Sequence, residues 1–269
     1  MRENCYFRLP FMALCLKNIG NKMKLDAYLQ PSFVEKELQF SKAVVIMIDV
    51  FRASTTICVA LNNGAKEILP IEDVDKAIRL YSNLDRESRF IGGERNGIRQ
   101  NGFNAGNSPE DYAPEAVKDK TVIFTTTNGT QVFNKCKSAK AKFVGAFVNL
   151  HALAEHIKKM TEADPEIAEI CVICAGNEGQ LAYEDATCAG AYINCFKEMF
   201  AECELTDAAL VASAIYERHK NELYEFVSNR EHGKYLKSIG FEKDTQIAMQ
   251  TDSCQVIPQI EGNIIKIAK

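Results

Sequence analysis

The chain has 269 residues, of which 46% are hydrophobic and 25% charged, and its formal net charge at pH 7 is -4. This balance is typical of a globular protein, and the acidic charge argues against a nucleic-acid-binding surface. No stretch of about 18 apolar residues is present, which argues against a membrane span. The length suits one large α/β domain or two intertwined halves.

Residues 1–22 differ in character from the rest of the chain. Arg2 and Arg8 precede a short apolar stretch, Leu9–Leu16, but Lys17 follows it and no small-residue cleavage site is present. We therefore expect residues 1–22 to be a disordered or non-native N-terminal extension rather than a signal peptide. Residues 23–269 are expected to form a single α/β domain.

The apolar run Ala43–Ile48 predicts a strand that is buried on both faces of a sheet. Asp49 follows it directly, and a helical pattern covers residues 53–62. The next elements are predicted as a short strand, an amphipathic helix and a short strand: 66–70, 72–84 and 90–91. A long polar loop, Asn96–Ser108, comes after them. A loop of this length in a compact domain is usually functional or disordered, and its glycines favour a functional role.

The second half of the chain continues this alternation. Strands are predicted at 121–125, 143–148 and 170–174, and helices from about residue 131, at 150–160 and at 183–202. Strands that alternate with helices predict a three-layer α/β/α fold with a mostly parallel or mixed sheet. The region after residue 207 is mainly helical. It is predicted to contain a helix, a late strand and an extended segment: 229–238, 245–250 and 256–258.

Cysteines and histidines give little sign of a metal or redox centre. Several of the ten cysteines lie within apolar patterns, which indicates a reducing cytosol. Cys171 and Cys174 have the CxxC spacing, but in a strand these positions point to opposite faces, which disfavours such a centre. The four histidines are scattered without metal-ligand spacing, so we expect solvated or capping roles for three of them.

Three polar clusters each follow a predicted strand: Asp49–Thr55, Thr125–Thr130 and Gly176–Asp185. The carboxyl ends of parallel strands meet at one edge of a sheet, so these clusters can converge on one pocket. The turn Thr126–Thr130 would place hydroxyls and backbone N–H groups at a helix N-terminus, which favours a bound anion; the alternative is a simple N-cap. Arg52 and Arg95 could contact phosphate or sulfonate oxygens, or form salt bridges to acids.

Carboxylates complete the pattern. Asp49, Glu94, Glu184 and Asp185 all lie where a strand meets a loop or a loop meets a helix. Oxygen ligands of this kind suit magnesium. Glu184 and Asp185 could equally stabilise a helix dipole. Asp49 directly follows a buried strand, where an unpaired carboxylate is costly, and this favours a functional role for it.

Other phosphatase chemistries are disfavoured by the absence of their loops. There is no P-loop, no cysteine precedes an arginine by six positions, and Arg218-His219 lacks the following glycine of histidine phosphatases. Phe51 stands two positions after Asp49, where haloacid-dehalogenase-type enzymes carry a second aspartate. Direct attack by water, assisted by a metal ion, is the chemistry that remains.

Taken together, five stretches resemble the 2-phosphosulfolactate phosphatase family in content and order, and span roughly residues 43–260. They are Ile48–Thr56, Gly92–Arg95, Gly102–Pro109, Thr125–Thr130 and Glu184–Ala191. No single stretch is diagnostic, but five in the same order make a specific match. The first 22 residues lie outside the resemblance, and residues 244–258 follow it only loosely.

The resemblance implies a magnesium-dependent phosphatase of a distinct α/β/α fold. Such an enzyme would hydrolyse 2-phospho-3-sulfolactate to 3-sulfolactate and phosphate, a step of coenzyme M biosynthesis. The motifs imply a set of pocket residues: Asp49, Arg52, Glu94, Arg95, Asn107, Asn128 and Asp185. We expect a cytoplasmic protein with a small anionic phosphorylated substrate, without nucleic-acid or membrane partners, and we allow for a homodimer.

We assign roles to these residues as hypotheses. Asp49, Glu94 and Asp185 would bind Mg²⁺ and, together with Arg52, form the catalytic set. The substrate-binding set would be Arg95, Asn107, Thr126, Thr127, Asn128, Gly129 and Thr130. The alternatives are a phosphatase for another small phosphorylated acid and a non-catalytic protein that binds small dianions.

Overall fold

The computed structural model describes residues 22–30, 32, 34, 40–95, 97–126 and 136–269. The expected N-terminal extension, apart from Lys22, lies outside these ranges, as does the start of the helix expected near residue 131.

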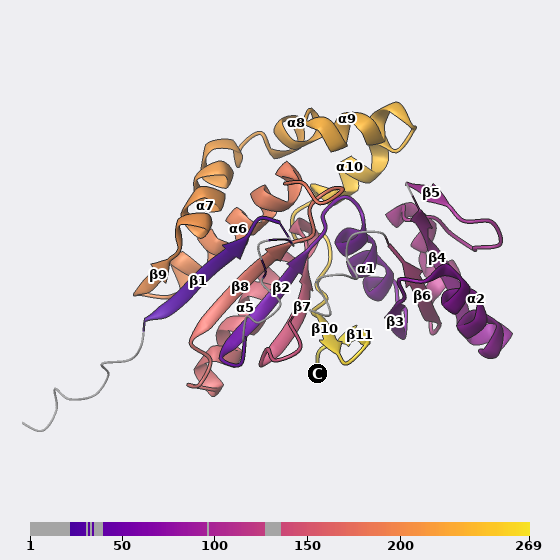
Figure 1. The fold of residues 1–269 in the computed structure, drawn as a ribbon, viewed down its shortest axis with the longest axis horizontal. Coiled ribbons are helices and arrows are strands. Elements are labelled where there is room, and N and C mark those ends of the chain that lie inside the picture. The colour runs from indigo at the N-terminus through magenta and orange to yellow at the C-terminus, as the bar shows by residue number, and fades with distance from the viewer. Residues whose placement is uncertain (1–21, 31, 33, 35–39, 96, 127–135) are drawn as a thin grey trace, which may run out of the picture.

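Within the described ranges, 11 strands form one sheet (Figure 1). Their bounds are β1 Met23–Tyr28, β2 Ala43–Ile48, β3 Glu67–Pro70, β4 Arg89–Arg95, β5 Ile98–Arg99, β6 Thr121–Thr125, β7 Ala141–Gly145, β8 Glu169–Cys174, β9 Cys203–Leu205, β10 Pro258–Glu261 and β11 Ile264–Ile267. The strands lie in the order β5-β4-β6-β3-β11-β10-β7-β2-β8-β1-β9.

Two parallel groups of strands are joined by an antiparallel hairpin. In the first group β2 pairs with β7 and β8, and β1 pairs with β8 and β9. In the second group β6 pairs with β3 and β4. The hairpin β10–β11 lies between the groups, antiparallel to β7 and to β3. The predicted mostly parallel or mixed sheet is confirmed.

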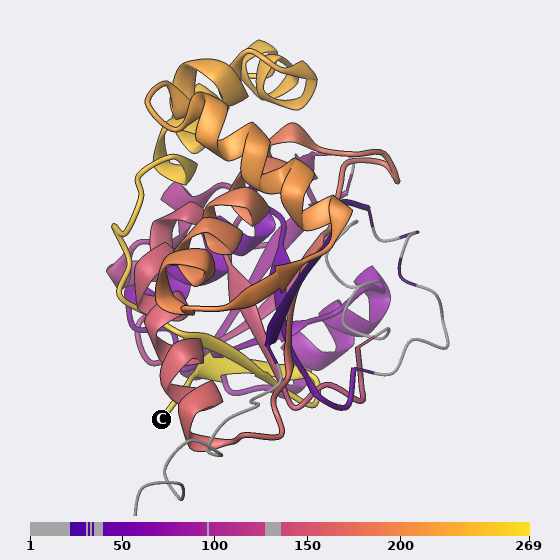
Figure 2. The same ribbon diagram turned by 90° about the vertical axis from the view of Figure 1, so that its left-hand side faces the viewer.

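Helices lie on both sides of this sheet, as the side view shows (Figure 2). Their bounds are α1 Ala53–Asn62, α2 Val74–Asn83, α3 Pro114–Val117, α5 Leu150–Ala163, α6 Tyr183–Met199, α7 Asp207–His219, α8 Leu223–Ser228, α9 Glu231–Ser238 and α10 Glu242–Ala248. Helices α5 and α6 share a buried core with one face of β2, and α1 shares a second core with the other face. The three-layer α/β/α architecture is confirmed.

Strand β2 shows why the layers form. Its residues are all buried, and they alternate between the two cores: Val44 and Ile46 belong to the core with α5 and α6, and Val45 and Met47 to the core with α1. The same alternation separates Cys171 and Cys174 of β8, which are free thiols in opposite cores. The sequence-based argument against a CxxC centre therefore holds.

The structure corrects several predicted elements near the C-terminus. Residues 245–250, predicted as a strand, lie mainly in helix α10, which buries Asp244, Thr245 and Ala248. The extended segment predicted at 256–258 leads into the β10–β11 hairpin, which was not predicted, and neither were β1 and β9. All of these strands are partly exposed, and β9, β10 and β11 are only 3 or 4 residues long, so their apolar patterns are weak.

The predicted strand at 143–148 ends earlier, at Gly145. Residues 147–149 form a single 3₁₀ turn instead. The side chain of Asn149 fixes this turn, because its Oδ1 accepts a hydrogen bond from the Ala146 N–H at 2.9 Å.

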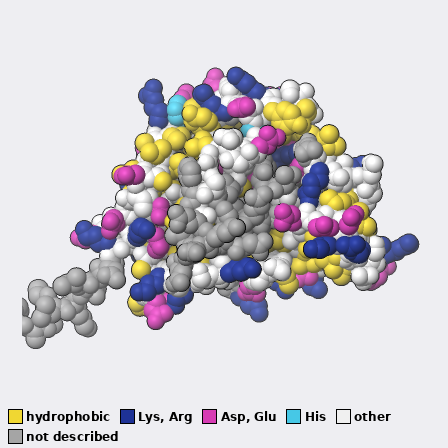
Figure 3. All heavy atoms as spheres, in the orientation of Figure 1, with side chains coloured by type: hydrophobic (Ala, Val, Ile, Leu, Met, Phe, Trp, Pro, Cys, Tyr) yellow, Lys and Arg dark blue, Asp and Glu magenta, His cyan; other side chains and the backbone are white. Residues whose placement is uncertain are grey.

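The C-terminal helices α8, α9 and α10 extend over the end of the sheet where β2 and β8 finish (Figure 1). None of the helices in the described part is both long and apolar enough to cross a membrane. On the face drawn in Figure 3, the coloured Lys and Arg side chains are interspersed with Asp and Glu. The position of α8, α9 and α10 makes the carboxyl edge of the sheet a covered site rather than an open surface.

Candidate active site

A cavity of about 330 Å³ lies at the carboxyl edge of the sheet, beneath helix α9. Its walls come from the ends of four strands, from the polar loop after β5, and from α9. The lining residues are Asp49, Phe51, Arg52, Glu94, Gly97, Asn107, Thr126, Asn177, Glu178, Glu231, His232, Tyr235 and Leu236. The three polar clusters that follow β2, β6 and β8 therefore each contribute to one cavity, as the parallel-sheet argument predicts.

Asp49 lines this cavity and lies immediately after β2. The Asp49 N–H donates to Ser54 Oγ at 2.8 Å, and the Ser54 N–H donates to the Asp49 carbonyl at 2.8 Å, so the start of α1 holds the residue in place. The pKa of the Asp49 carboxyl is raised to about 7, chiefly by burial; His232 lowers it, and nearby Glu94 and Glu184 add to the rise. A buried acid of this kind gains from a cationic partner.

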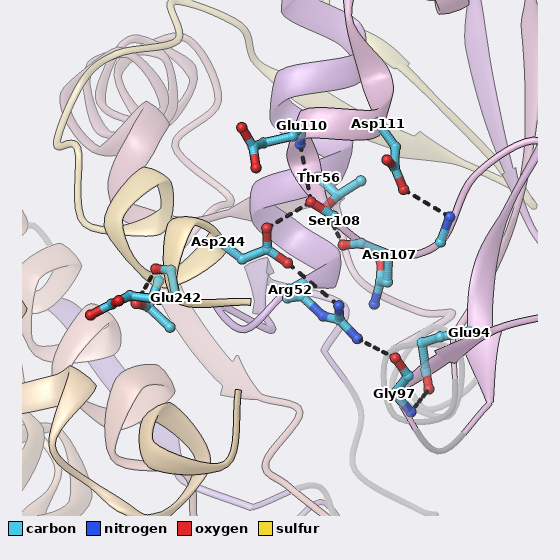
Figure 4. Close-up of polar contacts among 12 residues, drawn as sticks. Arg52, Thr56, Glu94, Gly97, Asn107, Ser108, Glu110, Asp111, Glu242 and Asp244 are labelled. Atoms are coloured by element: carbon cyan, nitrogen blue, oxygen red, sulfur yellow. Dashed lines mark hydrogen bonds and ion pairs between the residues drawn. The ribbon is translucent and has the colours of Figure 1, made fainter. Parts of the chain in front are cut away.

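Arg52 is 5% exposed and joins several segments around the cavity (Figure 4). Its Nη1 lies 3.4 Å from Asp244 Oδ2, and its Nη2 donates to the Gly97 carbonyl at 3.0 Å. The guanidinium also lies 4.5 Å from the centroid of the Phe241 ring. The ion-pair alternative considered for Arg52 is thus present, and its partner comes from α10.

Asp244 was not among the residues predicted from sequence. Its second oxygen, Oδ1, accepts a hydrogen bond from Ser108 Oγ at 2.6 Å, so it links Arg52 to the polar loop (Figure 4). Burial raises the pKa of Asp244, whereas Ser108 and Arg52 lower it. No local sequence signal pairs this acid with Arg52, because the two residues are 192 positions apart.

Glu94 and Asn107 line the cavity together with Asp49. Glu94 Oε2 accepts a hydrogen bond from the Gly97 N–H at 2.6 Å. Asn107 Oδ1 is buried and has no hydrogen-bond partner among the described residues, while the backbone carbonyl of Asn107 is fixed by Thr56 Oγ1 at 2.9 Å. An unpartnered buried oxygen is costly, so its position in a polar cavity points to a ligand.

Gly93 lets Glu94 reach the cavity. Its φ is +127°, and a Cβ atom there would lie 2.0 Å from the Thr125 carbonyl oxygen, so a larger residue does not fit. The close approach of β4 to the end of β6 brings Glu94 beside Thr126 in the cavity wall.

Asp185 does not line the cavity but supports the loops that do. Its Oδ1 accepts from the Val50 N–H at 2.8 Å and its Oδ2 from the Gly176 N–H at 2.9 Å, so it ties the loop after β2 to the loop after β8. Burial, with Glu184 and Asp49 nearby, raises the pKa of Asp185, and the two backbone donors oppose this. The structure does not bring Asp185 together with Asp49 and Glu94 as a ligand set.

Glu184, which is buried, and His232, which is partly buried, form a pair that the sequence did not indicate. His232 Nδ1 lies 2.5 Å from Glu184 Oε1, and the Glu184 side chain is 2% exposed. The His232 ring lines the cavity and packs edge-on against Phe51, with 5.7 Å between ring centroids. A helix places His232 on the same face as Leu236, which also lines the cavity, because residues four apart are neighbours on a helix.

The remaining predicted residues divide into three groups. Thr126 lines the cavity and is buried. Thr127, Asn128, Gly129 and Thr130 lie outside the described residues. Arg95 does not line the cavity, and it donates to the Glu72 carbonyl and, at 2.7 Å, to the Glu94 carbonyl. Neighbouring positions of a strand point to opposite faces, so the Arg95 side chain points away from the cavity while that of Glu94 points into it.

The oxygen donors of the cavity are of the type that a divalent metal ion takes. Among the residues that the structure describes, no group of three or more His, Cys, Asp or Glu side chains is close enough to hold a metal ion. Magnesium, however, usually takes one or two carboxylates and completes its shell with waters and substrate oxygens. The carboxylates of Asp49 and Glu94, with the unpartnered Oδ1 of Asn107, make a donor set of this type.

Comparison with known proteins gives a consistent result. A family model described as 2-phosphosulpholactate phosphatase matches residues 28–263. A "Probable 2-phosphosulfolactate phosphatase" of Caldicellulosiruptor saccharolyticus is 38% identical over 221 residues, covering 82% of this chain and 90% of that protein. Proteins of the same name are 34% identical in Caldanaerobacter subterraneus, over 84% of this chain and 90% of that protein, and in Clostridium novyi, over 88% and 97%.

Proposed function

The chain belongs to the 2-phosphosulpholactate phosphatase family, a family of phosphoric monoester hydrolases, and from this premise we propose that it hydrolyses 2-phospho-3-sulfolactate to 3-sulfolactate and phosphate. The observation that carries the proposal is the meeting of Asp49, Glu94 and Arg52 in one cavity at the carboxyl edge of the sheet. The relatives bear this substrate in their names.

In this proposal Asp49, Glu94 and the Oδ1 of Asn107 hold Mg²⁺. The ion, when bound, supplies charge neutralisation and Lewis-acid activation. Asp185 serves as a positioning residue, because its two oxygens fix the loops on either side of Asp49. Arg52 holds phosphate oxygens, since its guanidinium has more N–H donors than its contacts to Asp244 and Gly97 use.

The charge of the cavity supports a divalent cation. Four acids line it: Asp49, Glu94, Glu178 and Glu231. Against them, the described lining residues include one basic side chain of the lysine or arginine type, that of Arg52. A phosphate monoester is itself anionic and would be repelled from such a cavity. A bound Mg²⁺ reverses that repulsion, so we propose that the ester binds together with the ion.

A specific observation favours a second candidate, a phosphatase for another small phosphorylated acid. Arg95, expected to bind the sulfonate or the carboxylate of the substrate, is turned away from the cavity towards the Glu72 carbonyl. Among the described residues, Arg52 is then left as the arginine for both the phosphate and a second anionic group. A phosphorylated acid without a sulfonate would have one anionic group fewer for the site to bind.

A phosphate-release assay over small phosphorylated acids tests both candidates. We expect release from 2-phospho-3-sulfolactate with Mg²⁺ present and its loss when a chelator is added. Faster turnover of a phosphorylated acid that lacks the sulfonate would support the second candidate. Binding of these esters by the folded chain without release of phosphate would contradict both and favour a dianion-binding protein.

The location and assembly of the chain are part of the proposal. We propose the cytoplasm, because the cysteines of the described part, including Cys58, Cys188 and Cys254, are free thiols, which persist in a reducing compartment. The homodimer remains a prediction, which sedimentation of the purified chain will test. The expectation of a small-molecule substrate without a nucleic-acid partner is likewise unchanged.

A further inference from the structure

We propose that His232 donates a proton to the oxygen that leaves phosphorus, and that Glu184 holds it in position to do so. The proposal rests on the proposed phosphatase activity and adds a catalytic group to it. It starts from a cavity-lining histidine that the metal-assisted mechanism leaves unused and that is paired with a buried acid.

The geometry of the pair assigns the two ring nitrogens. His232 Nδ1 faces Glu184 Oε1 at 2.5 Å, which is a short, charge-assisted contact. A carboxylate at Nδ1 fixes the ring and stabilises the protonated imidazole. Because the same ring lines the cavity, we infer that Nε2 is the nitrogen offered to a bound ester.

Three elements hold this ring in place. Glu184 lies in the first turn of α6 and is 2% exposed, so it has little freedom to move. Phe51, from the loop after β2, packs edge-on against the ring. His232 itself lies on α9. The ring is therefore preorganised in the cavity that Asp49 also lines.

The chemistry of an alkyl phosphate explains why such a donor is needed. When the bond between phosphorus and the ester oxygen breaks, the electron pair stays on that oxygen, and an unprotonated alkoxide is a poor leaving group. His232 Nε2 gives this oxygen a proton as the bond breaks, while water forms the new bond to phosphorus. The proton released from the attacking water returns to His232 through solvent, so protons and charge balance over one turnover.

The leaving group provides the test. An alkyl ester needs the proton, whereas p-nitrophenolate leaves readily without one. We expect His232→Gln to lower kcat for 2-phospho-3-sulfolactate by about 10²–10⁴-fold, the usual contribution of general acid catalysis, with little change in KM. For p-nitrophenyl phosphate the same substitution should lower kcat by less than about tenfold, because p-nitrophenolate does not need a proton from His232 in order to leave.

Two further variants make the result specific. Glu184→Gln should show the same preference for the activated ester to a smaller degree, because a neutral amide can still accept from Nδ1 without supplying charge. His219→Gln is the matched control: His219 also pairs with a glutamate, Glu222, at 2.8 Å, but lies outside the cavity lining. It should leave both kcat values unchanged.

The outcomes separate this proposal from the proposed function. Equal losses on the two esters in His232→Gln, with thermal unfolding and Mg²⁺ binding like those of the wild type, would mean that His232 only supports the structure. Unchanged kcat on both esters would also overturn the proposal. If the wild type releases phosphate from neither ester, the proposed function fails and this proposal fails with it.

Discussion

Arg52 and Asp244, 192 positions apart in the sequence, form a buried ion pair at the edge of the cavity, with 3.4 Å between Nη1 and Oδ2. The side chains are 5% and 1% exposed. The pair attaches α10 to the loop that follows β2. Two charges removed from water in this way depend on each other, and the loss of one leaves the other unpaired.

We expect Asp244→Ala to lower the free energy of unfolding by about 3–5 kcal/mol, the usual effect of breaking a buried ion pair. Urea denaturation of the purified variant measures this. The matched control is Lys243→Ala, since Lys243 contacts Glu110 at 2.8 Å on the surface of the same helix, and its removal should have no measurable effect. A similar small effect for both variants would contradict an energetic role for the buried pair.

Asp49→Asn should remove turnover and, without metal, stabilise the fold at alkaline pH. Between 3.8 and about 7 the folded state keeps a proton on Asp49 that the unfolded state has lost. The free energy of unfolding therefore falls as pH rises through this range and stays reduced above it. Asparagine does not ionise, so its advantage should be complete at pH 8 and shrink towards pH 4.

Thermal unfolding of both proteins over this pH range, with and without Mg²⁺, checks the prediction for Asp49. The Tm of the variant should exceed that of the wild type at pH 8 by about 2–4 °C for each kcal/mol of relieved burial. Magnesium should raise the Tm of the wild type and leave that of Asp49→Asn nearly unchanged. Near-normal phosphate release by Asp49→Asn with saturating Mg²⁺ would refute its assigned role.

Asn107→Ala should weaken magnesium binding about tenfold or more, which corresponds to about 1.4 kcal/mol of binding free energy. The reason is that Oδ1 of Asn107 is a buried oxygen in the cavity without a partner in the described residues. Calorimetric titration with Mg²⁺ measures the affinity directly. Asn63→Ala is the matched control, because Asn63 bonds to the Tyr112 carbonyl away from the cavity. Equal affinities in both variants would remove Asn107 from the ligand set.

Asp185→Asn distinguishes a positioning role from metal ligation. An amide has one oxygen, so either the Val50 or the Gly176 N–H would lose its acceptor, at a cost of about 1–3 kcal/mol of unfolding free energy. Magnesium affinity should change little. Asp73→Asn, at the exposed N-cap of α2, is the control and should destabilise less. A large loss of magnesium affinity without loss of stability would make Asp185 a ligand.

Local patterns in the sequence were enough to predict the layers of the fold. The run Ala43–Ile48 predicts a strand buried on both faces, and its two sets of side chains do enter separate cores. The position of Asp49 at the end of that strand follows from the same run. Such features are decided over a few residues by the period of strands and helices, so they can be read without knowledge of distant segments.

The tertiary structure decided which side chains share the cavity. His232 lines it, and Asp244 pairs with Arg52 at its edge, because α9 and α10 lie over the carboxyl edge of the sheet. No periodicity in the sequence specifies that arrangement. The inward turn of Glu94 and the outward turn of Arg95 depend on how β4 pairs with β6. Asp185 does not line the cavity, because its carboxylate accepts hydrogen bonds from the backbone of two separate loops. Contacts between distant segments depend on packing and register, whereas sequence patterns report only on near neighbours.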